Sequence, residues 1–160
     1  MQYSIHLPNE FILTHLDQLL PGWLIPVVSV LVVLQQCQFP LLDKTPEAEQ
    51  QKHELRKRFI NFACKVALKL HEMGYLVDIF DPRTGWPMLS QPGRLKLDDV
   101  AVVQASLGYQ LSDRGGCMIL EHPAWGSSVY PSILVSSAEP TVVEAVASRI
   151  AAQPNPNLGL

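Results

Sequence analysis

Charged side chains are scarce in this chain: they make up 17% of its 160 residues, whereas 48% are apolar. Disordered chains show the opposite balance, so the composition predicts a folded protein. Twelve Lys and Arg against fifteen Asp and Glu leave a net charge of -3, which argues against a broad phosphate-binding surface and therefore against nucleic acid as a partner. A chain of this length can build one hydrophobic core. We expect a single domain over residues 1–153 and a flexible tail over residues 154–160.

Cysteine is equally sparse, and its spacing excludes the common metal-binding motifs. Cys37, Cys64 and Cys117 are odd in number and far apart, and the sequence contains no CxxC, HExxH or HxH pattern. We therefore expect three free thiols in a reducing compartment.

The chain also lacks an apolar run long enough to cross a membrane. Its most apolar stretch, residues 23–34, is interrupted by Pro26 and is shorter than the roughly 20 residues that a bilayer span needs. The first residues show no basic region followed by an apolar one, as a secretory signal would. These features predict a core strand near the N-terminus and a cytoplasmic protein without membrane contact.

Familiar catalytic motifs are missing as well. No GxGxxG, P-loop or GxSxG stretch is present, so nucleotide binding by a standard loop and serine-hydrolase chemistry lack support. Asp78 and Asp81 flank a strand end at an odd offset, and Asp81 fits a turn, so they do not form a convincing acid and base pair. We assign no catalytic residue.

The hydrophobic pattern predicts alternating helices and strands. Thr45 and Pro46 are typical of a helix start, and Gly74 of a helix end, which gives a helix about 42 Å long at about 28 residues. Its first half would protrude or pack on another subunit.

The remaining expected helices are residues 9–20, 98–106 and 141–152. Thr141 is the expected N-cap of the last helix, and residues 98–106 also fit a strand. One strand is expected over residues 27–33, with a continuation or partner at 35–42. Another is expected over residues 75–80, with a hairpin return over 86–89. Two more are expected over residues 117–121 and 129–135. Strands separated by helices indicate an α+β layered domain with a mostly antiparallel sheet.

Cys117 is the sharpest local signal for function. It follows Gly115 and Gly116 at the start of a strand, where a ligand can approach the backbone and meet a thiol. The alternative is that Cys117 is a small buried hydrophobe, which is the common state of a free cysteine. Cys37 and Cys64 have no comparable neighbours, and we expect both in the core.

The segment after this strand holds a histidine and a tryptophan. Cys117 and His122 are five residues apart, so in an uninterrupted strand their side chains point to opposite faces, which argues against a nucleophilic pair. His122 precedes a proline at a strand end, where a histidine often closes a turn. Trp125 and Gly126 follow in a short turn, and the indole is either a lid over a pocket, an interface anchor or a ring folded back on the sheet edge.

Several short motifs occur in order along the chain. They are Phe59-Ile60-Asn61, Glu72-Met73-Gly74-Tyr75, Asp78-Ile79-Phe80-Asp81-Pro82 with Gly85, Leu107-Gly108-Tyr109, Gly115-Gly116-Cys117, and His122 with Trp125-Gly126. Together they make the chain resemble the C-terminal domain of the cblD-type cobalamin trafficking proteins, the methylmalonic aciduria and homocystinuria type D family.

This resemblance implies a nitroreductase-like α+β fold without flavin and an adaptor without catalytic function. It implies association with a cblC-type cobalamin-processing protein and delivery of cobalamin to the B12-dependent enzymes methionine synthase and methylmalonyl-CoA mutase. Animal members have two adjacent cysteines at this strand start, and one thiol of that pair is implicated in binding cobalt. Here the positions are Gly116 and Cys117. The resemblance thus implies Cys117 as a cobalt ligand with Gly116 beside it, cobalamin bound only together with the partner, and His122, Trp125 and Gly126 in the partner interface.

Two other classes of function stay open at this point. One is a flavin-dependent reductase, which the small number of basic residues in loops disfavours. The other is a structural homodimer built on the long helix, and dimerisation is compatible with every reading.

Overall fold

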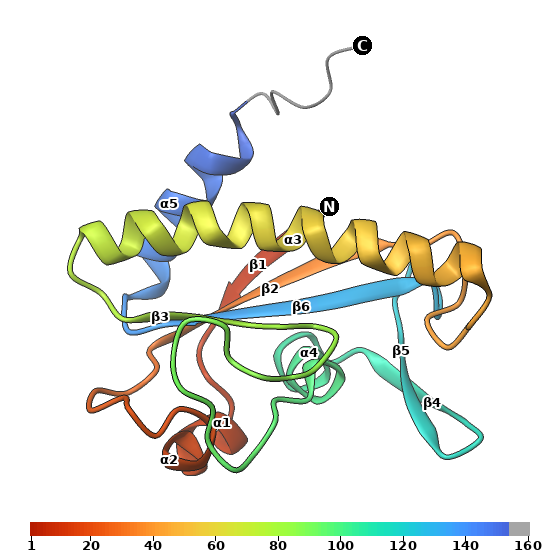
Figure 1. Cartoon of the computed structure of the whole chain (residues 1–160), viewed down its shortest axis with the longest axis horizontal. Helices are drawn as coiled ribbons and strands as arrows, with labels where there is room; N and C mark the ends of the chain where they lie inside the picture. The colour runs from red at the N-terminus through yellow and green to blue at the C-terminus, as the bar shows by residue number, and fades with distance from the viewer. Residues whose placement is uncertain (154–160) are drawn as a thin grey trace.

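The computed structural model describes residues 1–153, and a four-stranded antiparallel sheet forms its centre (Figure 1). The strand order is β1-β2-β6-β3, with bounds Gln2–His6, Ser29–Gln36, Val129–Ser136 and Val77–Phe80. The expected tail at residues 154–160 lies outside the described residues. The α+β class and the antiparallel sheet are as predicted.

The two middle strands of this sheet are buried on both faces. β2 pairs with β6 along its whole length, and all eight residues of β6 are buried, as are seven of the eight in β2. The valine-rich run was expected as a strand, and it forms one, although the strand begins only at Ser29. The expected continuation ends at Gln36 and leaves residues 37–42 in a loop. The edge strand β1 was not predicted, because its half-buried residues lack a clear pattern.

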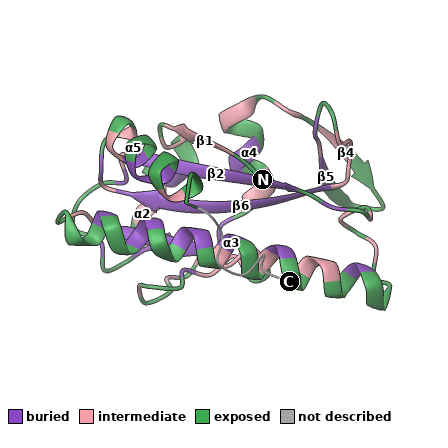
Figure 2. Cartoon of the chain, turned by 90° about the horizontal axis from the view of Figure 1, so that it is seen from above, coloured by how far each residue is buried: buried purple, intermediate pink, exposed green. Residues whose placement is uncertain are grey.

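One face of the sheet is covered by α3 (Pro46–Glu72) and α5 (Pro140–Ala151), and Figure 2 shows buried positions along α3. The predicted start of α3 is confirmed, since the Thr45 hydroxyl accepts a hydrogen bond from the N–H of Ala48 at 3.3 Å and Pro46 occupies the first turn. The helix ends before Gly74, whose φ of 90° only glycine adopts easily. Among the described helices, none has the length and apolarity needed to cross a membrane.

The predicted cap of α5 was wrong by two residues. Glu139 is the N-cap and makes no side-chain capping bond, while Pro140 occupies the first turn. Proline fits that position because its missing N–H has no intrahelical partner to lose. Thr141 therefore lies inside the helix.

The other face of the sheet is covered by short helices and by a separate hairpin. The expected helix over residues 9–20 is in fact two short helices, α1 (Glu10–Thr14) and α2 (Leu16–Leu19), which meet at His15. The helix expected near residue 98 is confirmed as α4 (Asp99–Leu107). Beside it, β4 (Gln110–Arg114) and β5 (Cys117–Glu121) form a two-stranded sheet, of which only β5 was predicted.

A single buried carboxylate holds the long loop after β3. Asp78 is fully buried and accepts four backbone hydrogen bonds of 2.8–3.1 Å, from the N–H groups of Ile79, Met88, Leu89 and Ser90. The hairpin return expected over residues 86–89 is reduced to one bridge between Phe80 and Pro87. The Asp78 carboxylate thus accepts backbone N–H groups of this part of the loop that a paired strand would otherwise accept.

We expect Asp78→Asn to lower the free energy of unfolding by about 2–4 kcal/mol, because the amide of asparagine cannot accept all four bonds and hydrogen bonds to a charged group contribute about 1.5–3 kcal/mol each. Urea denaturation measures the change. Asp113→Asn is the matched control, since Asp113 is exposed and accepts only the N–H of Gly116 among the described groups. Equal losses in both variants would show that the Asp78 bonds are dispensable.

Candidate functional site

Cys117 lies next to the tip of a hairpin that projects away from the main sheet (Figure 1). Gly115 and Gly116 form the two-residue turn with φ values of 65° and 86°, the left-handed region that such turns require. Arg114 and Cys117 are directly opposite each other across the turn, so the hairpin contains no bulge at this point. A side chain added at either glycine would meet nothing within 4 Å, so the tip is open on the side of these positions.

The three cysteines differ in how far they are exposed to solvent. Cys117 is exposed, as a ligand-binding thiol requires, and not a buried hydrophobe. Cys37 is buried as expected, and this burial raises the pKa of its thiol to about 11. The expectation for Cys64 was wrong: it lies on the exposed side of α3, away from the core positions of that helix.

His122 is the structural centre of the turn after β5. Its Nδ1 accepts hydrogen bonds from the N–H groups of Ala124 and Trp125 at 3.1 and 3.2 Å, so Nδ1 carries no proton. Nε2 then carries the hydrogen and faces Gln2 Oε1 at 3.3 Å. Backbone bonds in both directions between His122 and Gly126 complete the turn. Burial lowers the pKa of this imidazole, which favours its neutral form.

Trp125 stacks on this imidazole. The two ring centroids are 4.0 Å apart and the planes differ by 10°, while Tyr109 meets the His122 ring edge-on at 5.4 Å. The indole is half-buried against the core on one side and borders a groove on the other. The ring therefore packs back on the protein, which was one of the expected alternatives, and its other side lines a surface hollow.

The structure places Cys117 and His122 at opposite ends of β5. They are separated by the whole strand, about 16 Å at 3.3 Å per residue. Alternation along the uninterrupted strand directs their side chains to opposite faces, and no hydrogen bond joins them within the described chain. The expected absence of a nucleophilic pair agrees with this arrangement. Trp125 and Gly126 lie at the His122 end.

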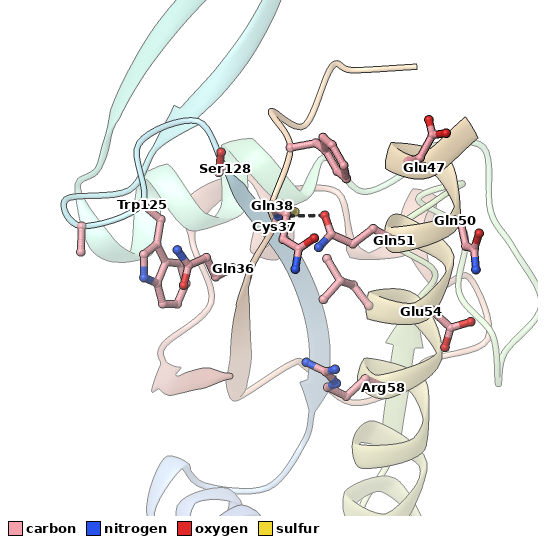
Figure 3. A pocket seen from close by; sticks show the side chains of 13 residues that line it. Gln36, Cys37, Gln38, Glu47, Gln50, Gln51, Glu54, Arg58, Trp125 and Ser128 are labelled. Atoms are coloured by element: carbon pink, nitrogen blue, oxygen red, sulfur yellow. Dashed lines mark hydrogen bonds between the residues drawn. The ribbon is translucent and has the colours of Figure 1, made fainter. Parts of the chain in front are cut away.

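The groove beside Trp125 was not predicted. It has a volume of about 1100 Å³ and is bordered by residues 36–39, the turn over residues 124–128 and the first half of α3 (Figure 3). Gln51 on α3 accepts a hydrogen bond from the N–H of Gln38 at 2.8 Å, which ties the helix to the loop. Arg58 and Glu54 supply charges of both signs on the helical side. No local motif marks this hollow, because its walls come from three distant segments.

The two carboxylates considered earlier have structural partners. Arg56 donates two hydrogen bonds, of 2.7 and 2.8 Å, to the two oxygens of Asp81, and this ion pair lowers the pKa of the carboxyl. The Asp78 carboxylate accepts backbone hydrogen bonds from the loop after β3. Within residues 1–153 no three His, Cys, Asp or Glu side chains gather closely enough to hold a metal ion.

The fold and these surfaces define a class of protein: an α+β domain that presents one thiol on a projecting hairpin and one aromatic turn at the far end of the same strand. Comparison with known proteins places the chain more closely. Residues 2–147 match the family model described as methylmalonic aciduria and homocystinuria type D protein. The chain belongs to this family.

Curated relatives carry the name cobalamin trafficking protein CblD. The human protein is 26% identical over 113 residues, which are 71% of this chain and 38% of the human one. The chicken protein, from Gallus gallus, shows the same identity and coverage. The protein of Rattus norvegicus is 24% identical over 138 residues, which are 86% of this chain and 47% of the rat one. The chain thus spans less than half the length of these relatives.

We expect the turn over residues 122–126 to loosen as the pH falls below about 6.5, the ordinary pKa of histidine. The pKa of His122 is lower in the folded state than in the unfolded state. The contribution of His122 to stability is therefore complete above the unfolded-state pKa, and it is lost as the pH falls through the folded-state pKa. Protonated Nδ1 cannot accept the two N–H groups. Amide hydrogen exchange at Ala124 and Trp125, corrected for intrinsic rates, measures the effect between pH 7 and pH 5.

His122→Asn supplies the control, because its side-chain oxygen accepts hydrogen bonds but does not titrate in this range. Protection at the two amides should then depend far less on pH. Amides of β6 report whether the whole domain opens. Constant protection of Ala124 and Trp125 in the unmodified protein would contradict the assignment.

Proposed function

We propose that this protein is a cobalamin trafficking adaptor and not an enzyme. In this proposal it binds a cblC-type cobalamin-processing protein and helps to pass cobalamin to B12-dependent enzymes. Membership in the type D family and the names of the relatives support a role in cobalamin metabolism. The observation that carries the proposal is the placement of Cys117, exposed beside two glycines at the tip of a projecting hairpin.

The chemistry of the tip suits cobalamin as cargo. A thiolate is a soft ligand for a metal, and cobalt in a corrin ring has axial positions that such a ligand can occupy. A corrin is broad and flat, so the thiol must stand where no neighbouring side chain blocks the approach. Gly115 and Gly116 meet this condition, because added side chains at either position would find open space. Binding of cobalamin then needs the partner to enclose the other face of the corrin.

The aromatic turn supplies the second part of the proposed partner surface. Large aromatic side chains beside a groove are common anchors in protein interfaces. Trp125 is held by its stack on His122 and by the turn hydrogen bonds, so little rotamer freedom is lost when a partner binds. Because Cys117 lies at the other end of β5, a partner that contacts both must extend along the hairpin.

Handover of cargo without catalysis agrees with how three polar side chains of the domain are used. His122 accepts two backbone N–H groups, Asp78 accepts four, and Asp81 is paired with Arg56. Each group is committed to holding the fold. The three free thiols fit the reducing environment of the cytoplasm. A nitroreductase-like fold without flavin stays a prediction of the resemblance, and a homodimer built on the long helix stays a prediction from the sequence.

An anaerobic absorbance titration of cob(II)alamin tests the role of Cys117. We expect a new thiolate-type band only when both this protein and a cblC-type protein are present, and we expect Cys117→Ser to abolish it. Cys64→Ser is the matched control, because Cys64 is also exposed but lies on α3. A band that persists in Cys117→Ser, or that disappears in Cys64→Ser, would contradict the assignment. Co-elution of the two proteins without any band would leave an adaptor that makes only protein contacts.

Trp125→Ala should weaken association with the cblC-type protein at least tenfold, or about 1.4 kcal/mol, because it removes the aromatic anchor. Isothermal titration calorimetry measures the dissociation constant. Trp86→Ala is the control, since Trp86 lies under Lys96 in the loop after β3 and away from the aromatic turn. Trp125→Phe keeps a ring on His122 and should retain part of the affinity. Equal effects of Trp86→Ala and Trp125→Ala would remove Trp125 from the interface.

A further inference from the structure

A second, smaller pocket lies where β6 extends beyond its neighbour β3. β3 pairs only with residues 133–136 of β6, so Tyr130 and Pro131 have no strand partner on that side. The loop after β3 and the start of α4 cover the gap and leave a pocket of about 330 Å³. This volume is near the lower end of the roughly 300–1,000 Å³ typical of ligand sites. The pocket is separate from the Cys117 tip and from the groove beside Trp125.

Asp99 is the unusual group in this pocket. It is the first residue of α4, and its Oδ1 is buried without a hydrogen-bond partner among the described residues. Burial raises the pKa of this carboxyl well above its ordinary range, and the carboxyls of Asp98 and Asp81 raise it further. Buried carboxyl oxygens are nearly always paired, because an unpaired one costs free energy. Asp98 differs from Asp99, since its Oδ1 caps α4 by accepting the N–H of Ala101.

Two cationic side chains near the pocket have other partners. Lys96 lines the pocket, but its Nζ lies 5.2 Å from the centroid of the Trp86 ring. Arg56 on α3 forms its ion pair with Asp81. None of the ion pairs found in residues 1–153 includes Asp99. Asp99 therefore lines the pocket and has no ion-pair partner among the described residues.

The rest of the lining is largely apolar. The walls include Leu41, Pro82, Leu97, Pro131 and the ring of Tyr130. A ligand that fits this lining has an apolar stem of a few carbons and a head group that donates hydrogen bonds and carries positive charge. An aromatic wall adds to the attraction for such a head group.

We propose that this pocket binds an ammonium or guanidinium group on a short apolar stem, with Asp99 as its counter-charge. The same chemistry occurs in free alkylamines and alkylguanidines and in a lysine or arginine side chain of a partner protein. The proposal is independent of the cobalamin role, because it involves neither Cys117 nor Trp125.

Isothermal titration calorimetry with n-butylguanidinium chloride and n-butylammonium chloride tests the site. We expect millimolar binding of one or both, no binding of the neutral analogue 1-butanol, and at least tenfold weaker binding to Asp99→Asn. Asp17→Asn makes the same substitution at an exposed position of α2 and should leave the affinity unchanged. Amide chemical shifts at Thr84, Leu97 and Val100 should move with the ligand, because these residues line the pocket.

The peptide acetyl-Gly-Arg-Gly-amide separates the two sources. Binding of the peptide that is lost in Asp99→Asn indicates a partner side chain, and binding of the alkyl cations alone indicates a free small molecule. Leu41→Trp places a large ring in the wall of the pocket and should abolish binding even if Asp99→Asn folds poorly. The proposal is overturned if no cationic probe binds, or if binding survives both Asp99→Asn and Leu41→Trp.

Discussion

The pairing of β2 with β6 is the constraint on which the rest of the molecule depends. The two strands are buried on both faces, so each face of the sheet needs its own cover. α3 and α5 supply one layer, and α1, α2, α4 and the hairpin supply the other (Figure 1). The β4–β5 hairpin is anchored near the start of β6, and only its far end projects. The exposed thiol is thus a consequence of where the core ends.

The parts of the fold that sequence reasoning predicted are those with local signals. Thr45 and Pro46 mark the start of α3, and the valine-rich run marks β2, because capping and burial leave a pattern within a few residues. β1 and β4 carry no such pattern: QYSIH is half-buried at an edge, and QLSDR is polar. These strands exist because of pairing with a partner strand, which a local pattern does not record. The N-cap of α5 was predicted wrongly for the opposite reason. Thr141 is a residue type that is common at N-caps, but in the structure the N-cap is Glu139.

The candidate sites divide in the same way. The glycines before Cys117 have a local meaning, since two consecutive glycines permit a tight hairpin turn with an open tip. The odd spacing between Cys117 and His122 argued against a side-chain pair, and the structure places the two residues at opposite ends of β5. In contrast, the groove beside Trp125 is assembled from three distant segments, and nothing in any one of them indicates it. Asp99 was also missed, because an aspartate in the first turn of a helix is already explained by the helix dipole.

The distribution of paired and unpaired polar groups gives the sites their different characters. Asp78, Asp81 and His122 are held by short contacts to backbone or guanidinium groups, and a group so held stabilises one conformation. Cys117 and Asp99 lack such contacts in different settings, since Cys117 is exposed at a tip and the Asp99 oxygen is buried without a hydrogen-bond partner among the described residues. A thiol in the open suits a cargo that a second protein encloses, whereas a buried carboxyl favours a cation that enters the pocket. If the two proposals hold, the two sites select their ligands by opposite means, exposure at one and desolvation at the other.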